Sequence, residues 1–142
     1  MTKVAPETNP QTLAETAVRA MFERDRASQA LGMQVLEIRP GYARVSMRIR
    51  EDMVNGHQLC HGGLIFTLAD SAFAFACNTY GATTVAAGAT IDFLRPGRAG
   101  DELIAEAREL TRSRRTGVYD VVVTNQSGER VALFRGRSHQ LA

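Results

Sequence analysis

The sequence has little net charge, no tryptophan and few cysteines, and each shortage argues against a class of protein. A net charge of +2 with no tryptophan and three tyrosines does not indicate nucleic-acid binding. No apolar run is long enough to cross a bilayer, and the first residues contain no apolar segment typical of a signal peptide. Cys60 and Cys77 are therefore expected to be free thiols, and the predicted location is the cytoplasm.

The chain contains enough apolar material for one domain. Hydrophobic residues make up 44% and charged residues 23%, as in ordinary globular domains, and 142 residues can bury a sizeable core. No repeat, low-complexity tract or linker divides the sequence. We therefore expect a single domain over residues 1–142, in which residues 1–10 form a loose N-terminal arm.

Hydrophobic periodicity predicts the order of the elements. An amphipathic helix is expected over residues 11–31, and an almost wholly apolar helix, which should be buried, from Gly62 or Gly63 to about Asn78. Residues 50–61 are expected to form a loop. Strands are expected over 33–38, 42–49, 83–94, 102–111, 118–124 and 130–139. This order predicts an α+β protein in which an antiparallel sheet wraps around one central helix.

One acid, Asp70, lies in the middle of the apolar helix. An unpaired buried carboxylate is costly, so it finds partners, shifts its pKa or takes part in chemistry. A structural aspartate that hydrogen-bonds Ser71, Thr67 or a neighbouring loop is the simpler alternative.

Gly62 and Gly63 stand where this helix begins, and its first backbone N–H groups have no intrahelical partner. Such a terminus suits an anion or a developing oxyanion, although the glycines could also serve only to let the chain enter a crowded core. Gly63 and Asp70 lie about 10 Å apart along a helix, so one carbonyl cannot touch both. If both belong to one site, a second copy must supply one of them, which predicts a two-fold dimer with two equivalent sites.

The segment NGHQLCHGG (residues 55–63), followed by Leu-Ala-Asp70, resembles the hotdog-fold acyl-CoA thioesterases, most closely the phenylacetate-degradation subfamily. The segments IDFLRPGRAGD, RTGVYDV and ALFRGRSH extend the resemblance over residues 12–140. The resemblance implies a hotdog fold, dimers with a continuous sheet and shared active sites, and homotetramers. It also implies hydrolysis of phenylacetyl-CoA or hydroxylated phenylacetyl-CoA in phenylacetate catabolism.

The resemblance also assigns roles by position. Asp70 matches the catalytic carboxylate and Gly62 the oxyanion donor, and Gly63 is a candidate to share that role. Asn55 matches a polar residue that orients substrate or water, and His61 matches the motif histidine. Asp70 would deprotonate water or attack the carbonyl directly. No cofactor or metal is expected, because the CoA thiolate is a good leaving group.

Other side chains are candidates for substrate contacts. Phe66, Phe73 and Phe75 could line an apolar pocket between subunits, with plain core as the alternative. Arg112, Arg114 and Arg115, near Arg108, could meet the phosphates of CoA, or form a solvated basic turn.

Three further candidate roles concern an assisting hydroxyl, a metal site and a thiol nucleophile. Some relatives add a hydroxyl on the strand after the helix, and Thr84 is the candidate here, although alanines follow it. His57, Cys60 and His61 have metal-ligand residue types but lack a nearby third acid. Cys60 as a nucleophile lacks an orienting third group.

Two alternative functions remain open at this point. A non-catalytic acyl-CoA-binding module or regulator would keep the glycines and the arginines but would not need Asp70. A hotdog dehydratase or hydratase would need a histidine and an acid placed for proton transfer at carbon.

Overall fold

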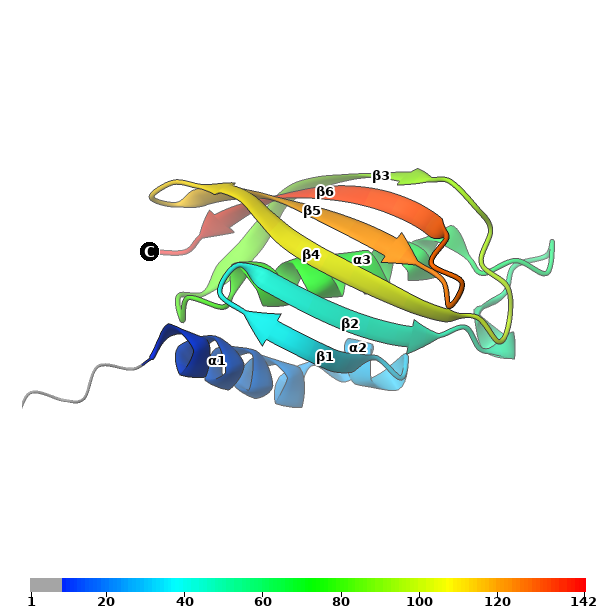
Figure 1. Cartoon of the computed structure of the whole chain (residues 1–142), viewed down its shortest axis with the longest axis horizontal. Coiled ribbons are helices and arrows are strands. Elements are labelled where there is room, and N and C mark those ends of the chain that lie inside the picture. The colour runs from blue at the N-terminus through cyan, green and yellow to red at the C-terminus, as the bar shows by residue number, and fades with distance from the viewer. Residues whose placement is uncertain (1–8) are drawn as a thin grey trace, which may run out of the picture.

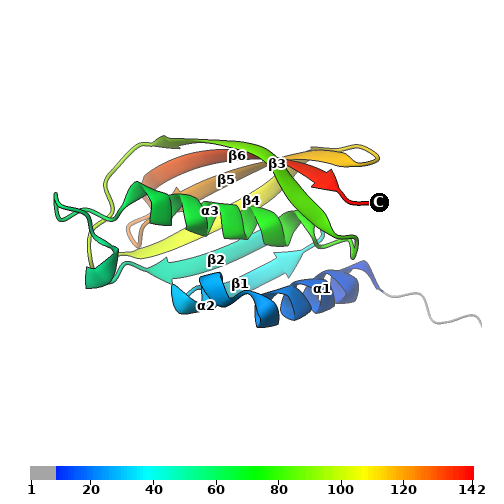
Figure 2. The same ribbon diagram turned by 180° about the vertical axis from the view of Figure 1, so that it is seen from behind.

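Six antiparallel strands form one sheet, and helix α3 (Gly62–Cys77) lies against one face of it (Figures 1 and 2). This computed structural model describes residues 9–142. The strand order is β1-β2-β4-β5-β6-β3. The strands are β1 (Gln34–Arg39), β2 (Tyr42–Arg48), β3 (Thr84–Phe93), β4 (Glu102–Arg112), β5 (Thr116–Thr124) and β6 (Arg130–Gln140). The predicted α+β class is confirmed, and each predicted strand is present with small shifts at its ends.

The N-terminal helical region contains two helices, α1 (Pro10–Arg24) and α2 (Arg26–Ala30), so the prediction of one continuous helix is wrong. The break occurs at Asp25, whose carboxylate accepts hydrogen bonds from the backbone N–H of Ser28 at 2.9 Å and from its hydroxyl at 2.6 Å. These bonds cap a new helix instead of continuing the first one.

The start of α1 also corrects the predicted N-terminal arm. Asn9 caps the helix by accepting the N–H of Gln11 at 2.8 Å, and Pro10 is the first helical residue. Proline suits this position because its missing N–H would have no partner there. The remainder of the predicted arm, residues 1–8, lies outside the described residues.

Helix α3 buries one face against the sheet and leaves the opposite face open. Its buried residues include Leu68, Ala72 and Phe73. The opposite side is a stripe of residues at helical spacing that are partly or fully exposed: Gly63, Thr67, Asp70 and Ala74. The prediction of a helix buried all round is therefore wrong for a single chain, because the sheet covers only one side of it.

A close approach between α3 and β6 sets how the helix is rotated on the sheet. Phe73 is 1% exposed, and its ring centroid lies 5.6 Å from that of Tyr119 and 5.8 Å from that of Phe134. A Cβ added at Gly136 would lie 2.8 Å from the Phe73 ring. The ring thus occupies space that only glycine leaves free, so Phe73 faces the sheet. Asp70 lies one turn earlier, about 60° around the helix, and is only partly buried.

The two edges of the sheet are β1 and β3. Most residues of β3 are exposed, including Val85 and Phe93, and a bulge interrupts its pairing with β6 between Ala86 and Gly88. Within residues 9–142, no helix is both long and apolar enough to cross a membrane.

The contact between Gly136 and Phe73 makes a prediction about stability. We expect Gly136→Ala to lower the free energy of unfolding by about 1–3 kcal/mol, because the added methyl group overpacks the core. Gly56→Ala is the matched control, since a Cβ at Gly56 meets nothing within 4 Å. Urea unfolding of both variants measures the difference, and equal midpoints would contradict the assigned contact.

Candidate active site

A tight loop immediately precedes the start of α3. The side-chain oxygen of Asn55 accepts the backbone N–H groups of His57 at 2.9 Å and Leu59 at 3.2 Å. The N–H of His61 donates to the carbonyl of Met53 at 2.8 Å, which closes the loop at its base. These two hydrogen bonds to its side-chain oxygen hold the Asn55 side chain in place. Its amide NH2 group donates to no acceptor within residues 9–142.

His61 caps the helix. Its Nδ1 accepts the backbone N–H of Gly63 at 2.9 Å, so in neutral His61 the proton is on Nε2. The N–H of Gly63 is therefore already engaged by His61, and a share for Gly63 in the oxyanion role stays a prediction. The N–H of Gly62 has no acceptor in the described part of the chain, and it remains the available donor.

A cavity of about 310 Å³ lies beside Gly62. Asn55 lines it on the loop side, and Phe93 from the end of β3 lines it on the other. The remaining lining residues are mostly apolar: Leu59, Cys60, Ile65, Leu94, Arg95 and Pro96. The structure thus brings two of the predicted site residues, Asn55 and Gly62, to one cavity. Phe93 and its neighbours were not predicted as site residues, since only the fold brings the end of β3 to the start of α3.

Asp70 is partly buried on the open stripe of α3, and within residues 9–142 its carboxylate makes no hydrogen bond or ion pair. Desolvation by burial raises the pKa of this carboxyl above its usual value. The hydrogen bonds considered for a structural aspartate, to Ser71 or Thr67, are not made: Ser71 pairs with Ser28, and Thr67 donates to the Gly63 carbonyl. Asp70 is eight residues from Gly62, about 12 Å along the helix, so one chain does not bring the two groups together.

The three phenylalanines considered as pocket-lining residues lie in different surroundings. Phe66 is partly exposed one turn after Gly62, and its ring packs edge-on against Phe134 with centroids 5.3 Å apart. Phe73 and Phe75 are buried in the core, 1% and 0% exposed, which favours the core alternative for both.

The hydroxyl and the backbone of Thr84 are both bonded within its own chain. Its Oγ1 donates to the carbonyl of Ala82 at 2.9 Å. Its backbone N–H and carbonyl both bond to Asn78, which follows the last turn of α3. Thr84 therefore lies at the opposite end of the helix from Gly62.

The basic residues lie around the β4–β5 hairpin, near the C-terminal end of α3 (Figures 1 and 2). The guanidinium of Arg112 stacks 3.4 Å above the centre of the Tyr80 ring and lies 3.7 Å from Glu109. Arg114 and Arg115 are exposed and make no ion pair in the described part of the chain. Within one chain these arginines do not border the cavity at Gly62.

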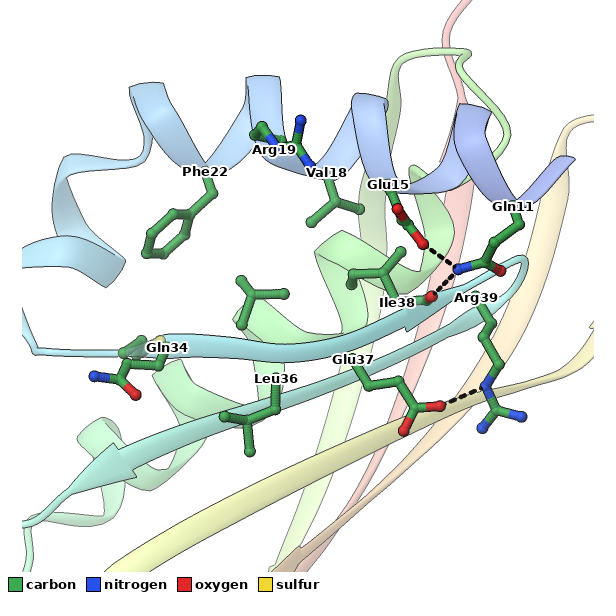
Figure 3. Close-up of a pocket in the computed structure, with 12 residues that line it drawn as sticks. Gln11, Glu15, Val18, Arg19, Phe22, Gln34, Leu36, Glu37, Ile38 and Arg39 are labelled. Atoms are coloured by element: carbon green, nitrogen blue, oxygen red, sulfur yellow. Dashed lines mark hydrogen bonds and ion pairs between the residues drawn. The ribbon is translucent and has the colours of Figure 1, made fainter. Parts of the chain in front are cut away.

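A larger cavity, about 900 Å³, lies elsewhere, between α1 and β1 (Figure 3). Val18 and Phe22 of α1 line it together with Leu36 and Ile38 of β1. The side-chain amide of Gln11 donates to the Ile38 carbonyl at 2.6 Å at one end. None of the predicted site residues lines this cavity.

Neither cysteine is activated. Burial raises the pKa of the Cys60 thiol, and it raises the pKa of Cys77 to about 12. Both side chains are therefore thiols near neutral pH, which argues against Cys60 as a nucleophile. Over residues 9–142, no group of three or more His, Cys, Asp and Glu side chains is arranged to hold a metal ion.

Known proteins share this sequence and fold. The family model described as the Thioesterase superfamily matches residues 57–132. An acyl-coenzyme A thioesterase of Escherichia coli, PaaI, is 51% identical over 122 residues, which cover 86% of this chain and 87% of PaaI. The structure of E. coli PaaI, described as a protein from the phenylacetic acid degradation operon, superposes with a TM-score of 0.93 at 47% identity, covering 94% of this chain and 97% of PaaI.

A more distant structure carries a ligand. A Streptococcus mutans protein bound to acetyl-CoA matches with a TM-score of 0.75 at 28% identity, covering 78% of this chain and 89% of that protein. Together these similarities confirm the resemblance to the hotdog-fold acyl-CoA thioesterases of the phenylacetate-degradation subfamily. The chain therefore belongs to the thioesterase superfamily and is a thioester hydrolase with the hotdog fold.

Proposed function

We propose that this protein is an acyl-CoA thioesterase that hydrolyses aryl-acetyl-CoA esters, phenylacetyl-CoA or its hydroxylated forms, to the free acid and CoA. The observation that carries the proposal is the pair of unsatisfied groups on α3, the Gly62 N–H and the Asp70 carboxylate. The similarity to PaaI supports the acyl-CoA substrate and a place in phenylacetate catabolism. The acetyl-CoA-bound relative supports the CoA part of the substrate.

The two groups would act on one carbonyl from two chains. The Gly62 N–H would donate to the carbonyl oxygen and stabilise the charge that develops on it. Asp70 of a second copy, facing it across a two-fold axis, would deprotonate water or attack the carbonyl carbon. Collapse of the tetrahedral species then releases the CoA thiolate. Asn55 would orient the substrate or the water, and His61 would hold the start of the helix.

A homodimer is supported by two surfaces that residues 9–142 of one chain leave uncovered. One is the open stripe of α3 that carries Asp70, and the other is the exposed edge of β3. An unpaired strand edge can pair with a second strand, which would make the sheet continuous across the dimer. Arg114 and Arg115 could then approach the CoA phosphates bound at the partner's Gly62 site, because antiparallel helices bring opposite ends together. A tetramer, a cytoplasmic location and independence of any cofactor or metal stay predictions.

Replacing the carboxylate tests its role. We expect Asp70→Asn to lower kcat for phenylacetyl-CoA by about 10²- to 10⁴-fold, as for the loss of a general base. Because burial disfavours the ionised carboxyl, the same change should raise the unfolding midpoint at pH 7. Thiol release and urea unfolding measure the two effects. Glu102→Gln, at an exposed acid on β4 away from the β3 edge, is the control, and equal activity of both variants would contradict the assignment.

The raised pKa of Asp70 also predicts a pH dependence. The reaction uses the ionised carboxylate, so kcat/KM should fall as the pH drops through the pKa of Asp70. That pKa lies above the value of about 3.9 for an unperturbed aspartate, so the acidic limb should begin at a correspondingly higher pH. The residual activity of Asp70→Asn should lack this limb, and a limb shared by both proteins would assign it to another group.

Mixing two inactive variants tests whether the site is shared. Gly62→Pro removes the free N–H and also places a ring against Phe93, and proline suits the first helical position after the extended His61. If each site combines Gly62 of one chain with Asp70 of the other, refolding Gly62→Pro with Asp70→Asn gives heterodimers with one intact site. Equal mixing should then restore about one quarter of the wild-type activity. A site within one chain would give no recovery.

A further inference from the structure

The acyl group of a thioester is covalently joined to the carbonyl carbon, so the acyl site must adjoin the oxyanion donor. The cavity beside Gly62 meets this condition. Its volume of about 310 Å³ lies at the small end of the range for ligand sites, which suits a single ring rather than a long chain. Its walls are mainly apolar, as an acyl group requires.

Phe93 forms the wall nearest to the donor. The tip of its ring lies 3.1 Å from the position that a Cβ on Gly62 would occupy. The absence of a side chain at Gly62 therefore leaves a space that the ring borders directly. Phe93 is 53% exposed, so much of its surface is free to contact a ligand in this chain.

The other lining residues offer no aromatic contact. Among the residues that line this cavity in the described part of the chain, Phe93 alone is aromatic. Phe66, the other ring near the start of α3, already packs edge-on against Phe134. Leu59, Ile65 and Leu94 would accept any apolar group of suitable size, and they do not distinguish a ring from an aliphatic chain.

We propose that Phe93 determines the preference for an aromatic acyl group, by packing against the ring of an aryl-acetyl thioester whose carbonyl oxygen accepts the Gly62 N–H. In an aryl-acetyl group one methylene separates the ring from the carbonyl carbon, so the ring lies close to the donor, where Phe93 is. This inference rests on the proposed thioesterase function. It assigns a specificity role to Phe93 of the chain that supplies the Gly62 N–H, while the other chain of the dimer supplies Asp70.

The experiment compares two substrates of similar size. Thiol release gives kcat/KM for phenylacetyl-CoA and hexanoyl-CoA, with the full-length wild type and with Phe93→Leu, which keeps an apolar side chain but removes the ring. The ratio of the two values should fall about fivefold in Phe93→Leu, because ring-on-ring contact adds to simple apolar burial. Phe93→Tyr keeps the ring and should keep the ratio. Leu110→Ala, an exposed apolar residue on β4 away from the cavity, should leave both values unchanged.

Size-exclusion chromatography checks that each variant assembles as the wild type does, and Phe93→Met replaces Phe93→Leu if that variant does not. A ratio that stays constant overturns the inference, even when both values fall together, because Phe93 would then contact CoA or support the fold. This failure is distinct from failure of the proposed function. A wild type that hydrolyses hexanoyl-CoA but not phenylacetyl-CoA would overturn both.

Discussion

The rotation of α3 on the sheet is the constraint on which the rest of the site depends. It is set where the Phe73 ring fills the gap left by Gly136 on β6, between Tyr119 and Phe134. Close-packed interiors tolerate few alternative placements of a large ring, so this contact fixes which side of the helix faces the sheet. Asp70 precedes Phe73 by three residues, about 60° around the helix, and lies at the border of the packed face, on the stripe that the sheet leaves open.

That orientation explains how a carboxylate can persist on an apolar helix. Asp70 is desolvated but has no partner among residues 9–142, so it carries an energetic cost that the packing of the rest of the helix must offset. The same helix begins with the N–H of Gly62, which also has no acceptor in the described part of the chain, whereas His61 accepts the next N–H, that of Gly63. The Asp70 carboxylate and the Gly62 N–H lie too far apart on one helix to contact the same carbonyl. A site that uses both groups therefore needs a second copy of the chain. Costly, unpaired polar groups are typical of active sites.

Sequence reasoning failed where hydrogen bonds between particular atoms override a pattern. The break at Asp25 depends on its carboxylate bonding Ser28 instead of letting one helix continue, although the apolar spacing runs through both helices. Gly63 has the same residue type and the same terminal position as Gly62, yet its N–H is occupied by His61. Phe93 was missed because it lies 31 residues after Gly62 in the chain. The contact between Phe93 and Gly62 forms only when the sheet packs against the helix, so a pattern of neighbouring residues cannot predict it.

By itself, the sequence determined the element order, the apolar character of the central helix and the positions of the HGG segment and Asp70. These depend on short-range periodicity and backbone propensity, so they can be read from neighbouring residues. The resemblance to hotdog thioesterases also rested on the sequence. Only the tertiary structure decided which glycine N–H is free, which phenylalanine borders it and which face of α3 is open. Those outcomes depend on packing between segments distant in the chain, where the space left by one side chain determines what another can reach.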